Sequence, residues 1–128
     1  MRRSKIIVPV HFVWRTKRQE AWITEDIEER LHRVIATEAG TLGAKVLAIG
    51  GTENHVHMAV LFPATISIGE FAKHIKGASS RLATTELLNR SVYWQEGYGA
   101  FAFQVGLTDR VVTYIQHQKE HHHTGVGL

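Results

Sequence analysis

The sequence predicts an α+β domain with the ferredoxin-like split βαβ arrangement, in which helices cover one face of an antiparallel sheet and a further helix follows. Two observations predict this fold. The apolar residues switch between a period of two and a helical period in the order strand, helix, strand, strand, helix, strand, helix. A short turn joins the two middle strands. With 128 residues, 44% of them apolar, we expect one core and a single domain over residues 1–128.

The first half of the chain predicts three strands and a helix. Apolar and polar residues alternate from Ile6 to Arg15, as in a half-buried strand. Thr24 can cap a helix that starts with two acidic residues and stops at Gly40. Two β-rich runs follow, Lys45–Gly50 and His55–Phe62, and the four residues between them favour a hairpin turn.

The second half predicts two helices around a fourth strand. Ser67, followed three residues later by a glutamate, forms a capping box before an amphipathic helix. The run Ala100–Val105 is typical of a strand. Thr108 or Asp109 then caps a last helix that we expect to continue to about His121.

Charge and cysteine content limit the possible functions. The chain has 15 Lys and Arg against 12 Asp and Glu, and the net charge of +3 permits a polyanionic partner without requiring one. The absence of cysteine excludes disulfides, cysteine nucleophiles and thiolate metal sites, and fits a cytoplasmic location. The longest stretch without Lys, Arg, Asp or Glu, Asn54–Gly69, is shorter than the roughly 20 residues of a spanning helix, so no membrane segment is expected.

His55 and His57 stand two residues apart on a predicted strand. Their side chains therefore project to the same side of the sheet and can chelate one metal ion. In a chain with nine histidines the pair alone fits a structural role as well.

Tyr114, Gln118 and His121 recur at helical spacing along the last predicted helix, beside an apolar stripe that contains Val111 and Ile115. Such a polar stripe fits either a catalytic face or an ordinary solvated surface.

Four segments help to decide between a catalytic and a structural role for these residues. In chain order they are HFVWRTK, TENHVHMAVLF, YWQEGYGAF and TYIQHQKEHH, and each lies on the element already predicted for it. Together they resemble the small single-tyrosine HUH transposases of insertion sequences and their REP-associated relatives. The resemblance extends from Pro9 to about His122.

The resemblance implies an enzyme and assigns its residues. His55 and His57 match the two histidines that bind a divalent ion, Mg²⁺ or Mn²⁺, and Gln118 matches the third ligand. Tyr114 matches the nucleophile that cuts single-stranded DNA bearing a hairpin and forms a 5′-phosphotyrosine link. His121 and His122 match a pair that follows the glutamine, for which we expect a supporting role.

The resemblance also implies partners. Members of the family are homodimers, and in many of them the tyrosine helix of one subunit lies against the histidine pair of the other. The basic residues that could contact DNA phosphates fit ordinary solubilising charge equally well, and they are Arg15, Lys17, Arg18, Lys73, Lys76 and Arg81.

Two other functions stay open. One is a REP-associated or domesticated nickase that acts on genomic hairpins without moving an element. The other is a non-catalytic ferredoxin-like DNA-binding regulator with structural histidines, against which the joint presence of the four matching site residues argues. His11 and His74 are expected to be structural or solvent-facing.

Overall fold

The computed structural model describes residues 5–119, which form a four-stranded sheet with helices on both faces. Short 3₁₀ turns, η1 (Lys17–Gln19) and η3 (Val105–Leu107), and a π-helical turn, η2 (Ala83–Leu87), lie between the main elements. These main elements are, in chain order, β1 (Pro9–Arg15), α1 (Glu25–Thr41), β2 (Lys45–Thr52), β3 (His55–Leu61), α2 (Ile68–Leu82), β4 (Gly99–Ala102) and α3 (Thr108–Gln116).

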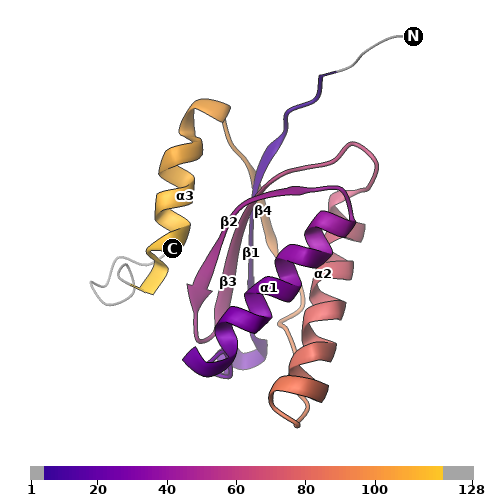
Figure 1. Cartoon of the computed structure of the whole chain (residues 1–128), viewed down its shortest axis with the longest axis vertical. Coiled ribbons are helices and arrows are strands. Elements are labelled where there is room, and N and C mark those ends of the chain that lie inside the picture. Colours follow the sequence, from indigo (N-terminus) through magenta and orange to yellow (C-terminus); the bar gives the residue numbers. More distant parts are fainter. Residues whose placement is uncertain (1–4, 120–128) are drawn as a thin grey trace.

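The strands pair in the order β2-β3-β1-β4, and every pair is antiparallel. Helices α1 and α2 cover one face of the sheet, and α3 lies on the other (Figure 1). This arrangement confirms the predicted α+β fold, including the separate last helix that carries the tyrosine.

The main core lies under α1 and α2. Alternate residues of the central strands point into it, because successive side chains of a strand face opposite sides. Phe12 from β1 and Met58 from β3 are directly opposite each other and buried, and the ring of Phe71 on α2 lies 5.1 Å from that of Phe12. The capping box is confirmed, since the Ser67 hydroxyl accepts a hydrogen bond from the Glu70 backbone N–H.

A second, smaller cluster holds α3 on the other face. Ile115 is buried there against Ala48 of β2 and Ala59 of β3. A Cβ atom on Gly50 would lie 2.2 Å from the Ile115 carbonyl oxygen. Only glycine at this position therefore lets the backbone of α3 come so close to β2.

The predicted boundaries around β4 and α3 differ from the structure. Strand β4 ends at Ala102 rather than Val105, because the chain turns into η3 after the edge of β1. Thr108 does not cap α3, because its hydroxyl donates to the Val105 carbonyl, and the residue before the helix is Leu107. The last helix is interrupted at His117, which leaves the helical backbone conformation, and it resumes at Gln118 and Lys119, while the predicted end at about His121 lies outside the described residues.

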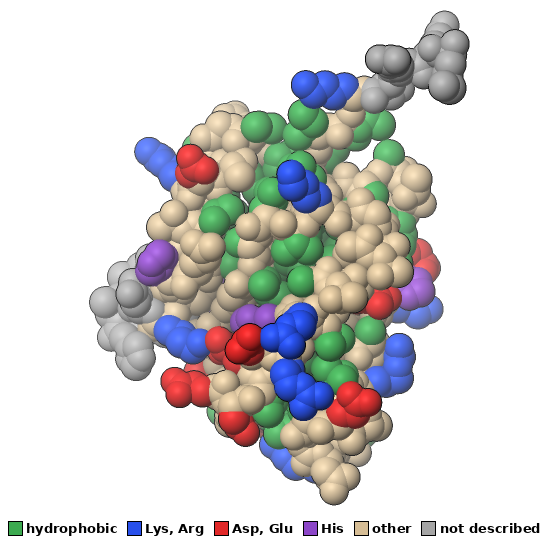
Figure 2. Space-filling model, viewed as in Figure 1, with side chains coloured by type: hydrophobic (Ala, Val, Ile, Leu, Met, Phe, Trp, Pro, Cys, Tyr) green, Lys and Arg blue, Asp and Glu red, His purple; other side chains and the backbone are tan. Residues whose placement is uncertain are grey.

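The surface carries interleaved charge. Figure 2 shows Lys and Arg beside Asp and Glu over the lower part of the face in view, whereas hydrophobic side chains gather above them. Within residues 5–119, no helix combines the length and the apolar character needed to cross a membrane.

Candidate active site

His55 and His57 lie on the sheet face that α3 covers, as their spacing predicts. Their ring centroids are 5.1 Å apart and both side chains are fully buried. The intervening Val56 points into the main core instead. Strand β3 therefore builds the core with one set of side chains and presents two imidazoles with the other.

Helix α3 brings Tyr114 to this histidine pair. The phenol ring meets the imidazole of His57 edge-on, with centroids 5.8 Å apart and planes at 86°. The contact forms within one chain, and the approach of α3 at Gly50 makes it possible. Tyr114 and the histidines, which are 57 or more residues apart in the sequence (114 − 57 = 57), form one cluster.

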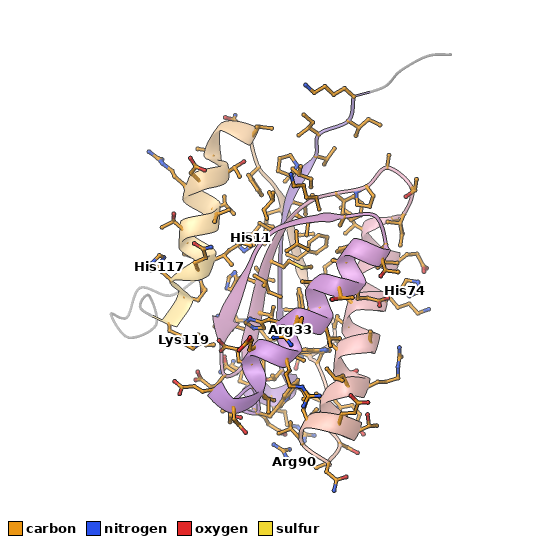
Figure 3. The ribbon with its side chains drawn as sticks, in the orientation of Figure 1. His11, Arg33, His74, Arg90, His117 and Lys119 are labelled. Carbon is orange, nitrogen blue, oxygen red and sulfur yellow. The ribbon has the colours of Figure 1, made fainter. Side chains whose placement is uncertain are left out.

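His11 of β1 also belongs to this cluster, which the sequence analysis did not foresee. Its Nε2 lies 2.8 Å from Nδ1 of His57, and its ring lies 6.3 Å from that of Tyr114. Figure 3 shows His11 on the side of the sheet that faces α3. The alternation in β1 was a usable signal, because it separates His11 from the core residues on either side of it. Burial lowers the pKa of His11, which favours its neutral form.

The turn before β3 orients His55. The Nδ1 atom of His55 lies 2.9 Å from the side-chain oxygen of Asn54 and 2.8 Å from the hydroxyl of Thr52. An amide oxygen can only accept a hydrogen bond, so Nδ1 of His55 donates to it. This tautomer leaves the lone pair on Nε2. The sequence segment TENHVH therefore carries the groups that fix its own first histidine.

Gln118 lies two residues beyond the end of α3, and its side chain is buried. Its Nε2 donates to the backbone carbonyl of Tyr114 at 3.1 Å, so the two predicted site residues are directly linked. Lys119 anchors the same segment to α1, since its ammonium lies 2.7 Å from both carboxylate oxygens of Glu28 (Figure 3). His121 and His122 lie outside the described residues.

The donor set fits a divalent metal ion. Hydrogen bonds to Nδ1 leave Nε2 as the ligating atom of His55, and the same holds for His57 when its Nδ1 donates to His11. In the described part of the chain, no three His, Cys, Asp or Glu side chains form a metal-binding group. The resemblance implies the amide oxygen of Gln118 as a third donor, and oxygen and imidazole ligands suit Mn²⁺ and related ions.

A cleft of about 520 Å³ opens beside the cluster, over the half of the sheet that β1 and β4 form. His11 and His57 contribute to its wall, together with Arg15 at the end of β1. The opposite wall is the segment Gln95–Gly99, and Phe101 of β4 completes the lining. The cluster thus adjoins a space that is open to solvent.

The six predicted DNA-contacting residues are spread over two regions. Arg15 lines the cleft and is exposed. Lys17 and Arg18 follow it in η1, where the Lys17 ammonium lies 5.6 Å above the ring of Tyr93. These three residues therefore extend from the cleft along one end of the sheet.

The other three basic residues lie on α2. Lys73 and Arg81 are exposed. Lys76 is engaged within the protein, because its Nζ donates to the carbonyls of Gln95 at 2.7 Å and Gly97 at 2.9 Å. Burial lowers the pKa of Lys76, and the nearby Glu96 opposes this shift. Lys76 thus fixes one wall of the cleft.

The fold and this site define a class of small α+β proteins with a histidine pair on a central strand and a tyrosine on the last helix. A family model described as "Transposase IS200 like" matches residues 5–118. The chain belongs to this family of transposases. No curated protein matches it.

Two solved structures share the fold. A candidate transposase from Deinococcus radiodurans R1 is 18% identical, with a TM-score of 0.73 over 90% of this chain and 95% of that one. A REP-associated tyrosine transposase bound to a REP hairpin is 15% identical, with a TM-score of 0.69 over 98% of this chain and 74% of that one.

Proposed function

We propose that this chain is a metal-dependent transposase that cleaves and rejoins single-stranded DNA, with Tyr114 as the nucleophile. The observation that carries the proposal is the edge-on packing of Tyr114 against His57, in the same buried cluster as His55. If Tyr114 were only a solvated surface residue, or the histidines only structural, Tyr114 would not need to pack against His57. Membership of the IS200-like family supports it independently.

The phenolic oxygen of Tyr114 attacks the phosphorus of a DNA phosphodiester after its proton has passed to water. The bond between phosphorus and the 3′ oxygen breaks, and that oxygen takes up a proton to become a free 3′-hydroxyl. The phosphate stays on the 5′ oxygen of the downstream strand and is joined through it to Tyr114 as a 5′-phosphotyrosine. Because the number of phosphoester bonds is unchanged, attack by a 3′-hydroxyl can reverse the step and rejoin a strand.

Three residues would hold Mg²⁺ or Mn²⁺ in this enzyme: His55, His57 and Gln118. Such an ion, when bound, polarises the phosphate oxygens and stabilises the charge that develops on them. Thr52 would keep Nε2 of His55 directed to the ion, and His11 would do the same for His57. Gln118 would in addition tie the ligand set to the backbone of the nucleophile.

We propose single-stranded DNA with a hairpin as the substrate, because a protein with the same fold is described as bound to a REP hairpin. Arg15, exposed in the cleft beside the cluster, would meet a phosphate. Binding should then weaken steeply as salt rises, since each neutralised phosphate releases counterions. A flat salt response would contradict the phosphate contacts.

The tyrosine and the histidine pair of one chain already meet, which supports cleavage in cis. The resemblance implies a homodimer, and light scattering measures that state directly. If the protein is a dimer, mixing Tyr114→Phe with His57→Ala chains tests the arrangement. Cleavage in cis leaves the mixed dimer inactive, because no single chain then has both groups, whereas recovered activity would show that a tyrosine acts on the partner's histidines.

The reaction itself is tested on a denaturing gel. Wild-type protein is incubated with Mn²⁺ and a pool of labelled single-stranded hairpins, next to Tyr114→Phe and the control Tyr93→Phe, whose ring is 60% exposed. We expect a covalent adduct with wild type and Tyr93→Phe and none with Tyr114→Phe. DNA binding without any adduct would favour the regulator, and an adduct that persists in Tyr114→Phe would contradict the assigned nucleophile.

A further inference from the structure

Apart from the phosphate contact proposed for Arg15, the cleft beside the cluster has no assigned ligand. Helix α3 covers the β2 and β3 half of its sheet face, and the cleft occupies the β1 and β4 half. Its volume of about 520 Å³ lies within the range of about 300 to 1,000 Å³ that is usual for small-ligand sites. A space of this size next to the nucleophile can hold a piece of the substrate.

Exposed aromatic rings line this cleft. Phe101 points into it and is 60% exposed, which is a large apolar surface to leave in water. The Phe101 ring folds back along β4 over Gly99. A Cβ atom on Gly99 would lie only 2.7 Å from the Cε2 atom of Phe101. Tyr98, 42% exposed, contributes to the same cleft, but its ring packs on the α2 side, 6.4 Å from that of Phe12. The Phe101 ring belongs to neither hydrophobic cluster and is available to a ligand.

The wall that carries Tyr98 is fixed in place. Lys76 holds two carbonyls of the segment Gln95–Gly97 from the α2 side, at 2.7 and 2.9 Å. On the sheet side, the Gln95 backbone N–H donates to the carbonyl of Arg15 at 2.7 Å. The cleft is therefore formed before a ligand binds, which reduces the entropy lost on binding.

The basic residues at the cleft indicate which kind of ligand it binds. Arg15 supplies a cation at the end of the cleft nearest the histidine pair, and Lys17 continues the basic surface beyond it. A ligand with an aromatic ring and an adjoining phosphate matches the exposed Phe101 ring beside a cation. Each unit of single-stranded DNA has both, and its bases stack on exposed aromatic side chains.

We propose that this cleft binds one unpaired nucleobase of the DNA strand beside the phosphate that Tyr114 attacks, stacked on Phe101. The inference deepens the proposed function and rests on it for the identity of the ligand. Arg15 meets the phosphate of the same nucleotide, and Gln95 and Glu96 lie where they can bond to the edge of the base. Lys76 is a positioning residue that acts through the wall.

The test separates binding of the base from catalysis by using Tyr114→Phe protein, which cannot react. Hairpin oligonucleotides are first selected for binding from a pool with a randomised unpaired flank. An abasic site is then moved along that flank, and affinity is measured by fluorescence anisotropy for proteins with Phe101, Phe101→Ala and Phe101→Trp. Thermal melting checks that each variant is folded.

We expect one flank position at which the abasic site weakens binding on the order of tenfold when residue 101 is Phe or Trp, but not in Phe101→Ala. A flank with no such position, a loss that persists in Phe101→Ala, or the absence of any bound oligonucleotide would overturn the proposal. So would a change of oligomeric mass in Phe101→Ala with unchanged affinity, since the ring would then contact a second copy of the chain.

Two lysine variants test the positioning role in the same assay. Lys76→Met should shrink the abasic effect and leave affinity for the abasic strand unchanged, whereas Lys73→Met should alter affinity for both strands equally. If Lys76→Met lowers the affinity for the intact and the abasic strand equally, Lys76 is a simple phosphate contact and not a positioning residue. The proposed function fails separately, if wild-type protein forms no adduct while the Phe101 result holds.

Discussion

The two faces of strand β3 differ in their packing and in the residues that they present. Towards α1 and α2, Val56, Met58 and Val60 are fully buried in an apolar core. Towards α3, the strand presents His55 and His57, and a cleft begins beside the second of them. The alternation of a single strand thus separates the residues that stabilise the fold from those proposed to react, and neighbouring substitutions should have different consequences.

The largest effect on the reactive face is expected from His57→Ala. Loss of one of two imidazole ligands should abolish the binding of Mn²⁺ and reduce adduct formation by several orders of magnitude. Isothermal titration calorimetry measures the binding without DNA. His74→Ala is the matched control, because His74 lies exposed on α2 (Figure 3). Unchanged Mn²⁺ affinity in His57→Ala would remove His57 from the ligand set.

Met58→Ala tests the opposite face one residue away. Truncation of a fully buried methionine should lower the free energy of unfolding by about 2–5 kcal/mol. Urea denaturation followed by circular dichroism measures this change. At low temperature, where the variant stays folded, its Mn²⁺ affinity should match that of wild type. A parallel loss of metal affinity would show that the two faces are not independent.

Gly50→Ala should act on the docking of α3. The added Cβ would collide with the Ile115 carbonyl, so α3 must move away from β2. A displacement of about 1 Å at a reacting group can cost about 100-fold in rate, and we expect adduct formation to fall by up to this factor. Gly40→Ala is the control, because nothing lies within 4 Å of its Cβ position in α1. Equal rates in both variants would contradict the close approach.

The smallest effect is expected from Glu28→Gln, which removes the ion pair with Lys119. The pair is partly exposed, so its loss should cost about 0.2–1 kcal/mol and less at high salt. Urea denaturation at two salt concentrations measures this. Glu29→Gln, which breaks the more exposed pair with Arg33, should cost less still. A salt-independent loss would mean that the carboxylate acts by packing instead.

Local patterns were sufficient for much of this protein. The alternation of β3 predicted that His55 and His57 share a face, and the capping box at Ser67 predicted where α2 begins. Both predictions depend on residues within a few positions of each other, where backbone geometry fixes the relation between side chains. The resemblance added the family and the proposed roles of Tyr114 and Gln118.

Other features depend on packing between distant segments. The bond between His11 and His57 spans 46 residues and needs the register of β1 on β3. The role of Lys76 was missed for the same reason, since a basic residue on a helix surface gives no sign of two carbonyls 19 and 21 residues further along the chain.

By itself, the sequence determined the order of the elements, the shared face of His55 and His57 and the residue types available for chemistry. The tertiary structure decided which of them meet: α3 docks at Gly50, Tyr114 packs on His57, and Phe101 stays exposed beside them. The physical reason is that periodicity is a property of the local backbone, whereas these contacts require the strands and helices to assemble around two different cores.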